Sequence, residues 1–164
     1  MEIRRARTAD IRAIRRLVDA YTSDRRLLSK ATVTLYESVQ EFWVAADDDG
    51  TVVGCGALHV MWEDLAEIRT VAVDPDHRGR KIGHQIVERL LGVARELGVA
   101  RVFCLTFETR FFGSFGFTEI DGAPVPHAVY EQLLRSYDEG VAEFLDLERV
   151  KPNTLGNTRM LLHL

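Results

Sequence analysis

The stretch that most constrains the fold of this chain runs from Glu67 to His84. It begins with a β-branched segment and continues through a Pro-containing turn and a basic, Gly-containing loop into an amphipathic helix. This order leaves the first backbone N–H groups of the helix without intrahelical partners, and the positive end of the helix dipole points to the same place. The loop also gathers positive charge in a chain whose net charge is −4, contributed by His77, Arg78, Arg80 and Lys81. The stretch therefore predicts a binding site for an anion such as a phosphate.

The loop does not match two common phosphate-binding motifs. A Walker loop requires G-x-x-x-x-G-K-[ST], and a dinucleotide fingerprint requires G-x-G-x-x-G followed by an acidic residue about 20 positions later. The segment from Arg78 to Gly83 reads R-x-x-K-x-G, with Lys81 at its centre, and fits neither pattern.

Length and composition fit one domain over residues 1–164. With 164 residues, of which 46% are hydrophobic and 28% charged, the chain can bury a substantial core. The 21 Lys and Arg residues are outnumbered by 25 Asp and Glu, which argues against nucleic acid or an anionic membrane as a partner. The charged N-terminal residues lead into no apolar signal segment, and no run approaches the roughly 18 apolar residues of a membrane span. We therefore expect a cytoplasmic protein.

Neither the cysteines nor the histidines predict a reactive or metal-binding site. Cys55 and Cys104 are far apart, each in an apolar, strand-like stretch, and we interpret them as buried, reduced thiols. A cysteine nucleophile would need a neighbouring base, which the sequence does not place. The five histidines lack the spacing of metal ligands, so no metal is expected.

Hydrophobic periodicity and turn signals predict an alternation of strands and helices. We expect a helix with a solvated arginine face after a cap at Thr8–Asp10, and a hairpin around an Asp-Gly turn. Two glycines in the second hairpin strand, Gly54 and Gly56, predict a bulge or a close backbone approach. The expected strands are 3–7, 42–46, 51–62, 65–74, 101–106, 116–120 and 158–164, and the expected helices are 11–21, 32–40, 82–97, 109–115 and 128–137.

This order of elements, with two local motifs, resembles the GNAT-type N-acetyltransferases. The loop of residues 78–83 is similar to that family's R/Q-x-x-G-x-G/A motif, except that Lys81 replaces the central glycine. The segment F-F-G-S-F-G-F-T at 111–118 is similar to the aromatic and Gly-Phe segment after the fifth strand. The resemblance implies an α/β GNAT fold with a mixed, mostly antiparallel sheet that is splayed between strands 4 and 5 and flanked by helices.

The resemblance also implies acetyl-CoA as the donor, held by the loop and by the backbone of the fourth strand. An N–H near Val71 would stabilise the thioester oxyanion while the acceptor amine attacks directly, without a covalent enzyme intermediate. The residues expected to contact the donor are Val71, Ala72, Val73, Arg78, Gly79, Arg80, Lys81, Ile82, Gly83, His84 and Phe112. Phe112 stands where many relatives carry a tyrosine as general acid, so that role is unassigned.

Glu67 resembles the general base of histone-type members of the family. Four residues of strand place it about 13 Å from Val71, which predicts a bridging water. Strand alternation puts four residues on one face unless a bulge intervenes, namely Glu67, Arg69, Val71 and Val73. A base and a guanidinium side by side would suit an amino acid as acceptor. Alternatively, Glu67 pairs with Arg69 or another cation, and Arg69 forms a surface or structural ion pair.

Within the family, the chain is similar to the acetyltransferase domain of N-acetylglutamate synthases, through segments such as Cys55-Gly56-Ala57-Leu58 and Phe103-Cys104-Leu105-Thr106. This implies acetylation of glutamate at the start of arginine biosynthesis, with Lys30 as a substrate ligand. Arg25 and Arg26 are further carboxylate-binding candidates, unless they are ordinary surface charge. Glu108-Thr109 replaces an Arg-Ser pair, which keeps glutamine or another amino acid open.

We expect a homodimer without the amino-acid kinase domain of the longer enzymes and without arginine control through that domain. The alternatives are a GNAT enzyme for another small-molecule or peptide amine and a non-catalytic acyl-CoA sensor. Lys81 and Phe112 motivate the sensor alternative, because both depart from the family pattern.

Overall fold

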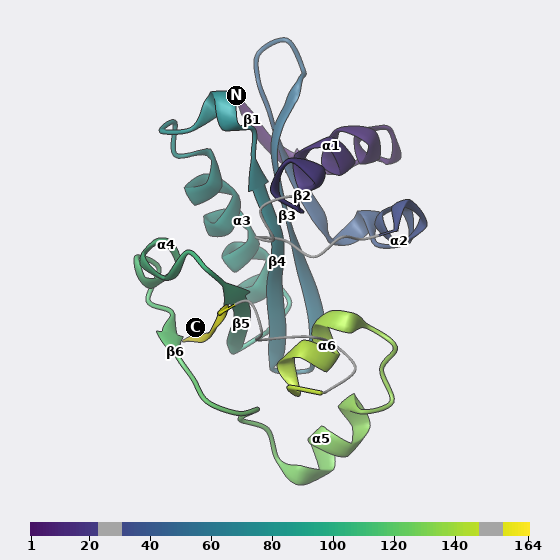
Figure 1. The fold of residues 1–164 in the computed structure, drawn as a ribbon, viewed down its shortest axis with the longest axis vertical. Coiled ribbons are helices and arrows are strands. Elements are labelled where there is room, and N and C mark those ends of the chain that lie inside the picture. Colours follow the sequence, from purple (N-terminus) through teal and green to yellow (C-terminus); the bar gives the residue numbers. More distant parts are fainter. Residues whose placement is uncertain (23–30, 148–155) are drawn as a thin grey trace. The chain divides into compact units, whose positions relative to one another are not determined.

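In the computed structural model, residues 1–22, 31–147 and 156–164 are described (Figure 1). The strands are β1 (Glu2–Arg5), β2 (Phe42–Ala46), β3 (Val52–Trp62), β4 (Leu65–Val73), β5 (Arg101–Thr106), β6 (Thr118–Glu119) and β7 (Thr158–His163). The α-helices are α1 (Ile11–Thr22), α2 (Thr32–Glu37), α3 (Ile82–Glu96), α4 (Thr109–Gly113), α5 (His127–Leu133) and α6 (Glu139–Phe144). Short 3₁₀ turns are η1 (Thr8–Asp10), η2 (Val39–Glu41) and η3 (Pro75–His77).

The strands form one mixed sheet in the order β1-β2-β3-β4-β5-β7-β6. Four of its neighbouring pairs, β1–β2, β2–β3, β5–β7 and β6–β7, are antiparallel, whereas β4 and β5 run parallel. The parallel pairing joins Leu65, Ala66 and Glu67 to Arg101, Val102 and Phe103, at the beginning of both strands. The predicted α/β fold, with a mixed and mostly antiparallel sheet flanked by helices, is confirmed.

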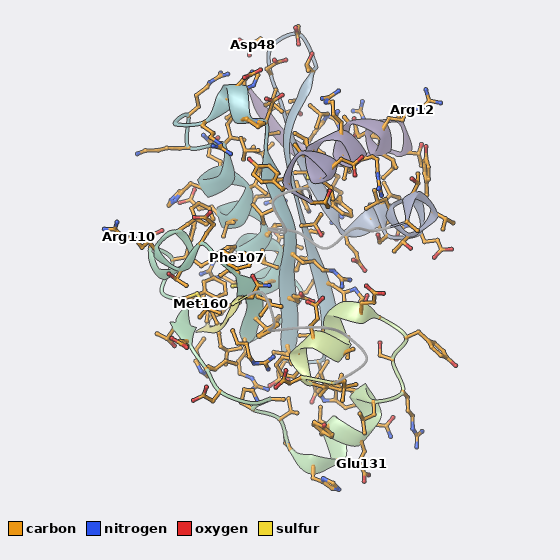
Figure 2. All side chains as sticks on the ribbon, in the orientation of Figure 1. Arg12, Asp48, Phe107, Arg110, Glu131 and Met160 are labelled. Carbon is orange, nitrogen blue, oxygen red and sulfur yellow. The ribbon has the colours of Figure 1, made fainter. Side chains whose placement is uncertain are left out.

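The chain divides into two compact units, of which the first comprises Met1–His59 and Ile68–Leu97. Here α1 and α2 lie on one side of the strands and α3 on the other (Figure 1). The apolar face of α1 is buried as its periodicity predicts, and the opposite face carries the exposed Arg12, which points away from the strands (Figure 2). The core between α1, α2 and the strands includes Ile11, Ile14, Leu17, Val18, Leu35, Phe42, Val44, Cys55 and Ala72.

The helix α3 lies close against the backbone of β3. A Cβ atom added to Gly54 would lie 2.9 Å from side-chain atoms of Ile82 and Ile86, and one added to Gly56 would lie 2.7 Å from Ile86. These glycines therefore mark a close approach of α3 to the backbone of β3. A close approach was one of the two predicted alternatives, the other being a bulge. The pairing of β2 with β3 also shifts register between Ala45 and Ala46.

Within the predicted cap at Thr8–Asp10, the capping side chain is that of Asp10. The Asp10 carboxylate, rather than the Thr8 hydroxyl, accepts a hydrogen bond from the backbone N–H of Arg7 at 2.7 Å. The same carboxylate receives both terminal nitrogens of Arg4, at 2.7 and 3.0 Å. The hydrogen bond from Arg4 holds the pKa of Asp10 below its usual value, so this cap is a carboxylate at neutral pH.

The second unit comprises Val60–Glu67 and Gly98–Leu164. Its core is built around Phe103 and Phe144, whose rings meet edge to face with centroids 5.1 Å apart. Arg159 is buried and donates to the backbone carbonyls of Glu143, Gly122 and Phe144 at 2.7, 2.8 and 2.5 Å, which ties β7 to the end of α6. The helix α6 lies in a stretch for which the sequence predicted no element.

Candidate functional site

The loop between β4 and α3 contains two residues with a left-handed backbone. Gly79 has a φ of 82°, and Lys81, the N-cap of α3, has a φ of 57° in the left-handed region. No side chain of the N-cap hydrogen-bonds to the first turn of the helix. The first N–H groups of this 15-residue helix are therefore not capped by that residue, and they are of the kind that binds phosphate.

The conformation of Lys81 explains why related loops carry glycine at the same position. A left-handed residue other than glycine brings its Cβ close to the following carbonyl oxygen, at a cost of roughly 1–2 kcal/mol. The backbone at position 81 adopts this left-handed conformation with lysine in place. The departure from the family motif therefore adds a side chain, and with it this strain, at position 81.

Three exposed cations surround this helix terminus, namely Arg78, Arg80 and Lys81. The Arg78 guanidinium lies over the ring of Tyr21, 5.9 Å from its centroid, and the Tyr21 hydroxyl donates to the carbonyl of Val73 at 2.5 Å. Tyr21 thus links α1 both to the end of β4 and to the loop. The remaining candidates differ in exposure, because Ile82 is buried, whereas Gly83 and His84 are partly exposed and His84 lies 3.2 Å from Glu88.

The strand β4 changes its alternation at Thr70, which has a φ of 59°. Before this residue, the side chain of Arg69 reaches Glu41. After it, the side chain of Val71 lies on the side of the strands that faces α3, 3.4 Å from a Cβ built on Gly56. Arg69 and Val71 therefore point to opposite faces of β4. A bulge at Thr70 interrupts the strand alternation that would have put them on one face.

Glu67 is a buried carboxylate, with only 2% of its surface exposed. It lies in the paired part of β4, opposite Phe103. A side chain so enclosed is not ordinary surface charge, and a proton that reaches it must come through neighbouring groups or an enclosed water.

Both cysteines are buried and reduced, as the sequence predicts. Burial raises the pKa of the Cys55 thiol to about 12. Burial, and then the negative charge of Glu67, raise the pKa of the Cys104 thiol well above its usual value. Since the thiolate is the nucleophilic form, these environments disfavour a role for either cysteine as a nucleophile.

Two further groups of residues were predicted from the sequence. Lys30, Arg25 and Arg26 lie outside the described residues. Phe112 is buried, and its ring packs edge to face against Phe111 and Phe117, with centroids 5.1 and 5.4 Å apart.

Sequence reasoning missed Glu41 and His59, which lie beside Arg69. Oε1 of Glu41 is 2.7 Å from Nδ1 of His59, and Oε2 of Glu41 is 3.4 Å from Nη2 of Arg69. The three residues are far apart along the chain and form no motif. The only available signal was His59 itself, a titratable residue near the end of an apolar strand.

Two other features are absent from the described parts of the chain. In residues 1–22, 31–147 and 156–164, no group of three or more His, Cys, Asp or Glu side chains could hold a metal ion. Nor does any helix in these ranges have the length and apolar character needed to cross a membrane.

Comparison with known proteins agrees with this geometry. The family model described as "Acetyltransferase (GNAT) family" matches residues 11–117. The amino-acid acetyltransferase of Mycobacterium tuberculosis is 65% identical over 162 residues, which cover 98% of this chain and 92% of that protein.

Two solved structures are similar in fold. The crystal structure of Rv2747 from Mycobacterium tuberculosis in complex with CoA and NLQ has a TM-score of 0.95 and 64% identity, and the match covers 100% and 99% of the two chains. The N-acetylglutamate synthase from Neisseria gonorrhoeae, complexed with coenzyme A and N-acetyl-glutamate, has a TM-score of 0.80 at 23% identity. That match covers 99% of this chain but 35% of the other.

These matches confirm the family that was recognised from the sequence. They also confirm that this chain is similar to amino-acid acetyltransferases in particular. The expected donor also agrees with the similar structures, which were solved with CoA. Because the family model spans the fourth strand, the basic loop and the aromatic segment together, the chain belongs to the GNAT family of acetyltransferases.

Proposed function

We propose that this protein transfers the acetyl group of acetyl-CoA to the α-amine of an amino acid, with L-glutamate or L-glutamine as the acceptor. The observation that carries the proposal is the 65% identity, over nearly the whole of both chains, with the amino-acid acetyltransferase of Mycobacterium tuberculosis. With glutamate as acceptor, the reaction is the first step of arginine biosynthesis.

The donor is held by the loop and by the end of β4. Acetyl-CoA supplies an activated acyl group as a thioester. The N-terminal N–H groups of α3, with Arg78, Arg80 and Lys81, bind its phosphates. The backbone of Val71–Val73 pairs with the extended arm of the donor in the manner of an added strand. A backbone N–H near Val71 stabilises the negative charge that develops on the carbonyl oxygen, an effect of about 3 kcal/mol per donor in acyl-transfer sites.

The acceptor is bound and deprotonated by the first half of β4. Glu67 takes a proton from the acceptor ammonium through a bridging water, because the free amine is the attacking form. Arg69 binds the α-carboxylate, since a guanidinium recognises a carboxylate with two parallel hydrogen bonds. Both residues belong to β4 and precede the left-handed Thr70.

The side chain of the acceptor distinguishes glutamate from glutamine. Glu108 is exposed two residues after the end of β5, where the family resemblance implies an arginine. A negative charge at this place disfavours the second carboxylate of glutamate and is compatible with the neutral amide of glutamine. This single observation supports glutamine as the second candidate acceptor.

The test is a coupled assay of thiol release from acetyl-CoA with each amino acid in turn. We expect turnover with glutamate or glutamine and loss of turnover when the α-carboxylate of the acceptor is blocked as an amide. No turnover with any α-amino acid would refute the proposal. Undiminished turnover of the blocked acceptor would favour an enzyme that acts on peptide or other amines.

A further inference from the structure

Three polar side chains of the first unit converge although they come from separate elements. Glu41 is the last residue of η2, His59 lies in β3 and Arg69 lies in β4. The Glu41 carboxylate stands between the other two, with Oε1 2.7 Å from Nδ1 of His59 and Oε2 3.4 Å from Nη2 of Arg69. The exposed fractions of the three side chains are 27%, 22% and 12%, respectively. The cluster is thus partly screened from water, which strengthens its electrostatic interactions.

The two contacts of Glu41 differ in strength. A carboxylate can only accept hydrogen bonds, so Nδ1 of His59 carries the hydrogen and donates it. A length of 2.7 Å is short for such a bond, which means that His59 fixes the orientation of the carboxylate. The contact with Arg69, at 3.4 Å, is long. A ligand carboxylate that met the guanidinium at the usual distance of about 2.8 Å would bind it more tightly than Glu41 does.

This combination is suited to orienting the side chain of Arg69. A guanidinium presents its N–H donors in a planar fork, and Glu41 contacts the fork at one terminal nitrogen, Nη2. An arginine side chain also has many rotamers, so ordering it before the ligand arrives lowers the entropy cost of binding. The negative charge of Glu41 compensates the positive charge of Arg69 until the ligand carboxylate is bound.

We propose that Glu41 is a positioning residue of the acceptor site, held by His59 so that it orients Arg69 to receive the α-carboxylate of the amino acid, a role that rests on the proposed function. Glu41 touches neither the acceptor nor the donor in this role. It acts through Arg69, and His59 acts through Glu41. A merely structural ion pair would instead affect the stability of the fold and leave acceptor binding unchanged.

The test is steady-state kinetics of Glu41→Gln with the amino acid that the wild-type enzyme turns over. We expect the acceptor KM to rise about tenfold, within the range of coupling between neighbouring residues, while kcat and the acetyl-CoA KM change by less than about twofold. The matched control is Glu37→Gln, which removes the same charge from the exposed end of α2 and should leave all three constants unchanged. An acceptor KM that stays the same or falls in Glu41→Gln would overturn the proposal.

Two further measurements separate positioning from general damage. The α-carboxamide of the same amino acid, used as a competitive inhibitor, should have equal inhibition constants with wild type and Glu41→Gln, because Arg69 then has no carboxylate to receive. In an Arg69→Lys background, Glu41→Gln should have no further effect on the acceptor KM. A persistent difference in either measurement contradicts the proposed route through Arg69.

Substitution of His59 tests the contact between His59 and Glu41. His59→Leu removes the donor to Glu41 and should raise the acceptor KM as Glu41→Gln does, whereas His59→Gln retains an N–H donor and should recover part of the loss. Equal constants for His59→Leu and wild type would overturn the role of His59. If the wild type turns over no α-amino acid, the proposed function itself fails; if it does and the Glu41 variant is unaffected, only the positioning role fails.

Discussion

Replacing Lys81 by glycine should stabilise the fold and weaken CoA binding at the same time. Lys81 has a φ of 57°, a left-handed conformation that costs a residue with a Cβ roughly 1–2 kcal/mol. Glycine removes this strain but adds freedom to the unfolded chain, which costs about 0.5–1 kcal/mol. The net gain is about 0.5 kcal/mol, or about 1–2 °C in Tm for a chain of this size.

The comparison with Lys81→Ala makes this expectation sharper. Alanine keeps a Cβ in the left-handed region, so it keeps the strain while removing the same ammonium group. Glycine should therefore exceed alanine by the same net amount, about 0.5 kcal/mol in the free energy of unfolding or about 1–2 °C in Tm. Thermal unfolding of the three proteins, without ligand, measures this difference.

The affinity for CoA should respond to charge and not to backbone strain. Lys81 is exposed, so its attraction to a phosphate is screened and contributes about 0.5–1 kcal/mol. Glycine and alanine should both weaken CoA binding by about two- to fivefold and reduce its salt dependence, as measured by titration calorimetry at two ionic strengths. Equal Tm values for the two variants would refute the strain argument, and an unchanged affinity in both would refute the contribution of the ammonium.

Three further outcomes follow from the fold and the candidate site. Glu67→Gln should lower kcat by about 10²–10⁴-fold, the usual contribution of a general base, with acetyl-CoA binding unchanged by calorimetry. Gly56→Ala should lower the free energy of unfolding by about 1–3 kcal/mol in denaturant titrations, because its Cβ would lie 2.7 Å from an isoleucine atom of α3. The control Gly92→Ala, in α3 itself with nothing within 4 Å of the added Cβ, should gain about 0.5–1 kcal/mol. Asp10→Asn should destabilise the protein at pH 7, and its difference from wild type should shrink below about pH 4, as the carboxyl whose folded pKa Arg4 lowers becomes protonated.

The elements with strong local signals could be predicted from the sequence. The helix α3 has a sustained apolar face and β4 a run of β-branched residues, and both were placed within a residue or two of their observed bounds. The helix expected over residues 128–137 instead ends at Leu133. Beyond it, Leu134 and Tyr137 are exposed by 45% and 96%, so further turns would have no apolar face to bury.

The candidate site was only partly predictable, because its contacts are non-local. The donor loop is continuous in sequence and carries a motif, so its residues could be named. Glu41, which contacts Arg69, and His59, which contacts Glu41, come from two other elements, and neither occurs in a recognisable pattern. The left-handed conformation of Thr70 could not be predicted either, since a β-branched residue is among the least expected in that conformation.

The left-handed Thr70 separates β4 into two segments that can be altered independently. Arg69, before it, and Val71, after it, point to opposite sides of the strand. A substitution that changes the size or charge at position 69 therefore need not disturb the backbone that follows. Under the proposed function, position 69 is therefore a place to redirect the enzyme toward other amines while the segment proposed to bind CoA is left as it is.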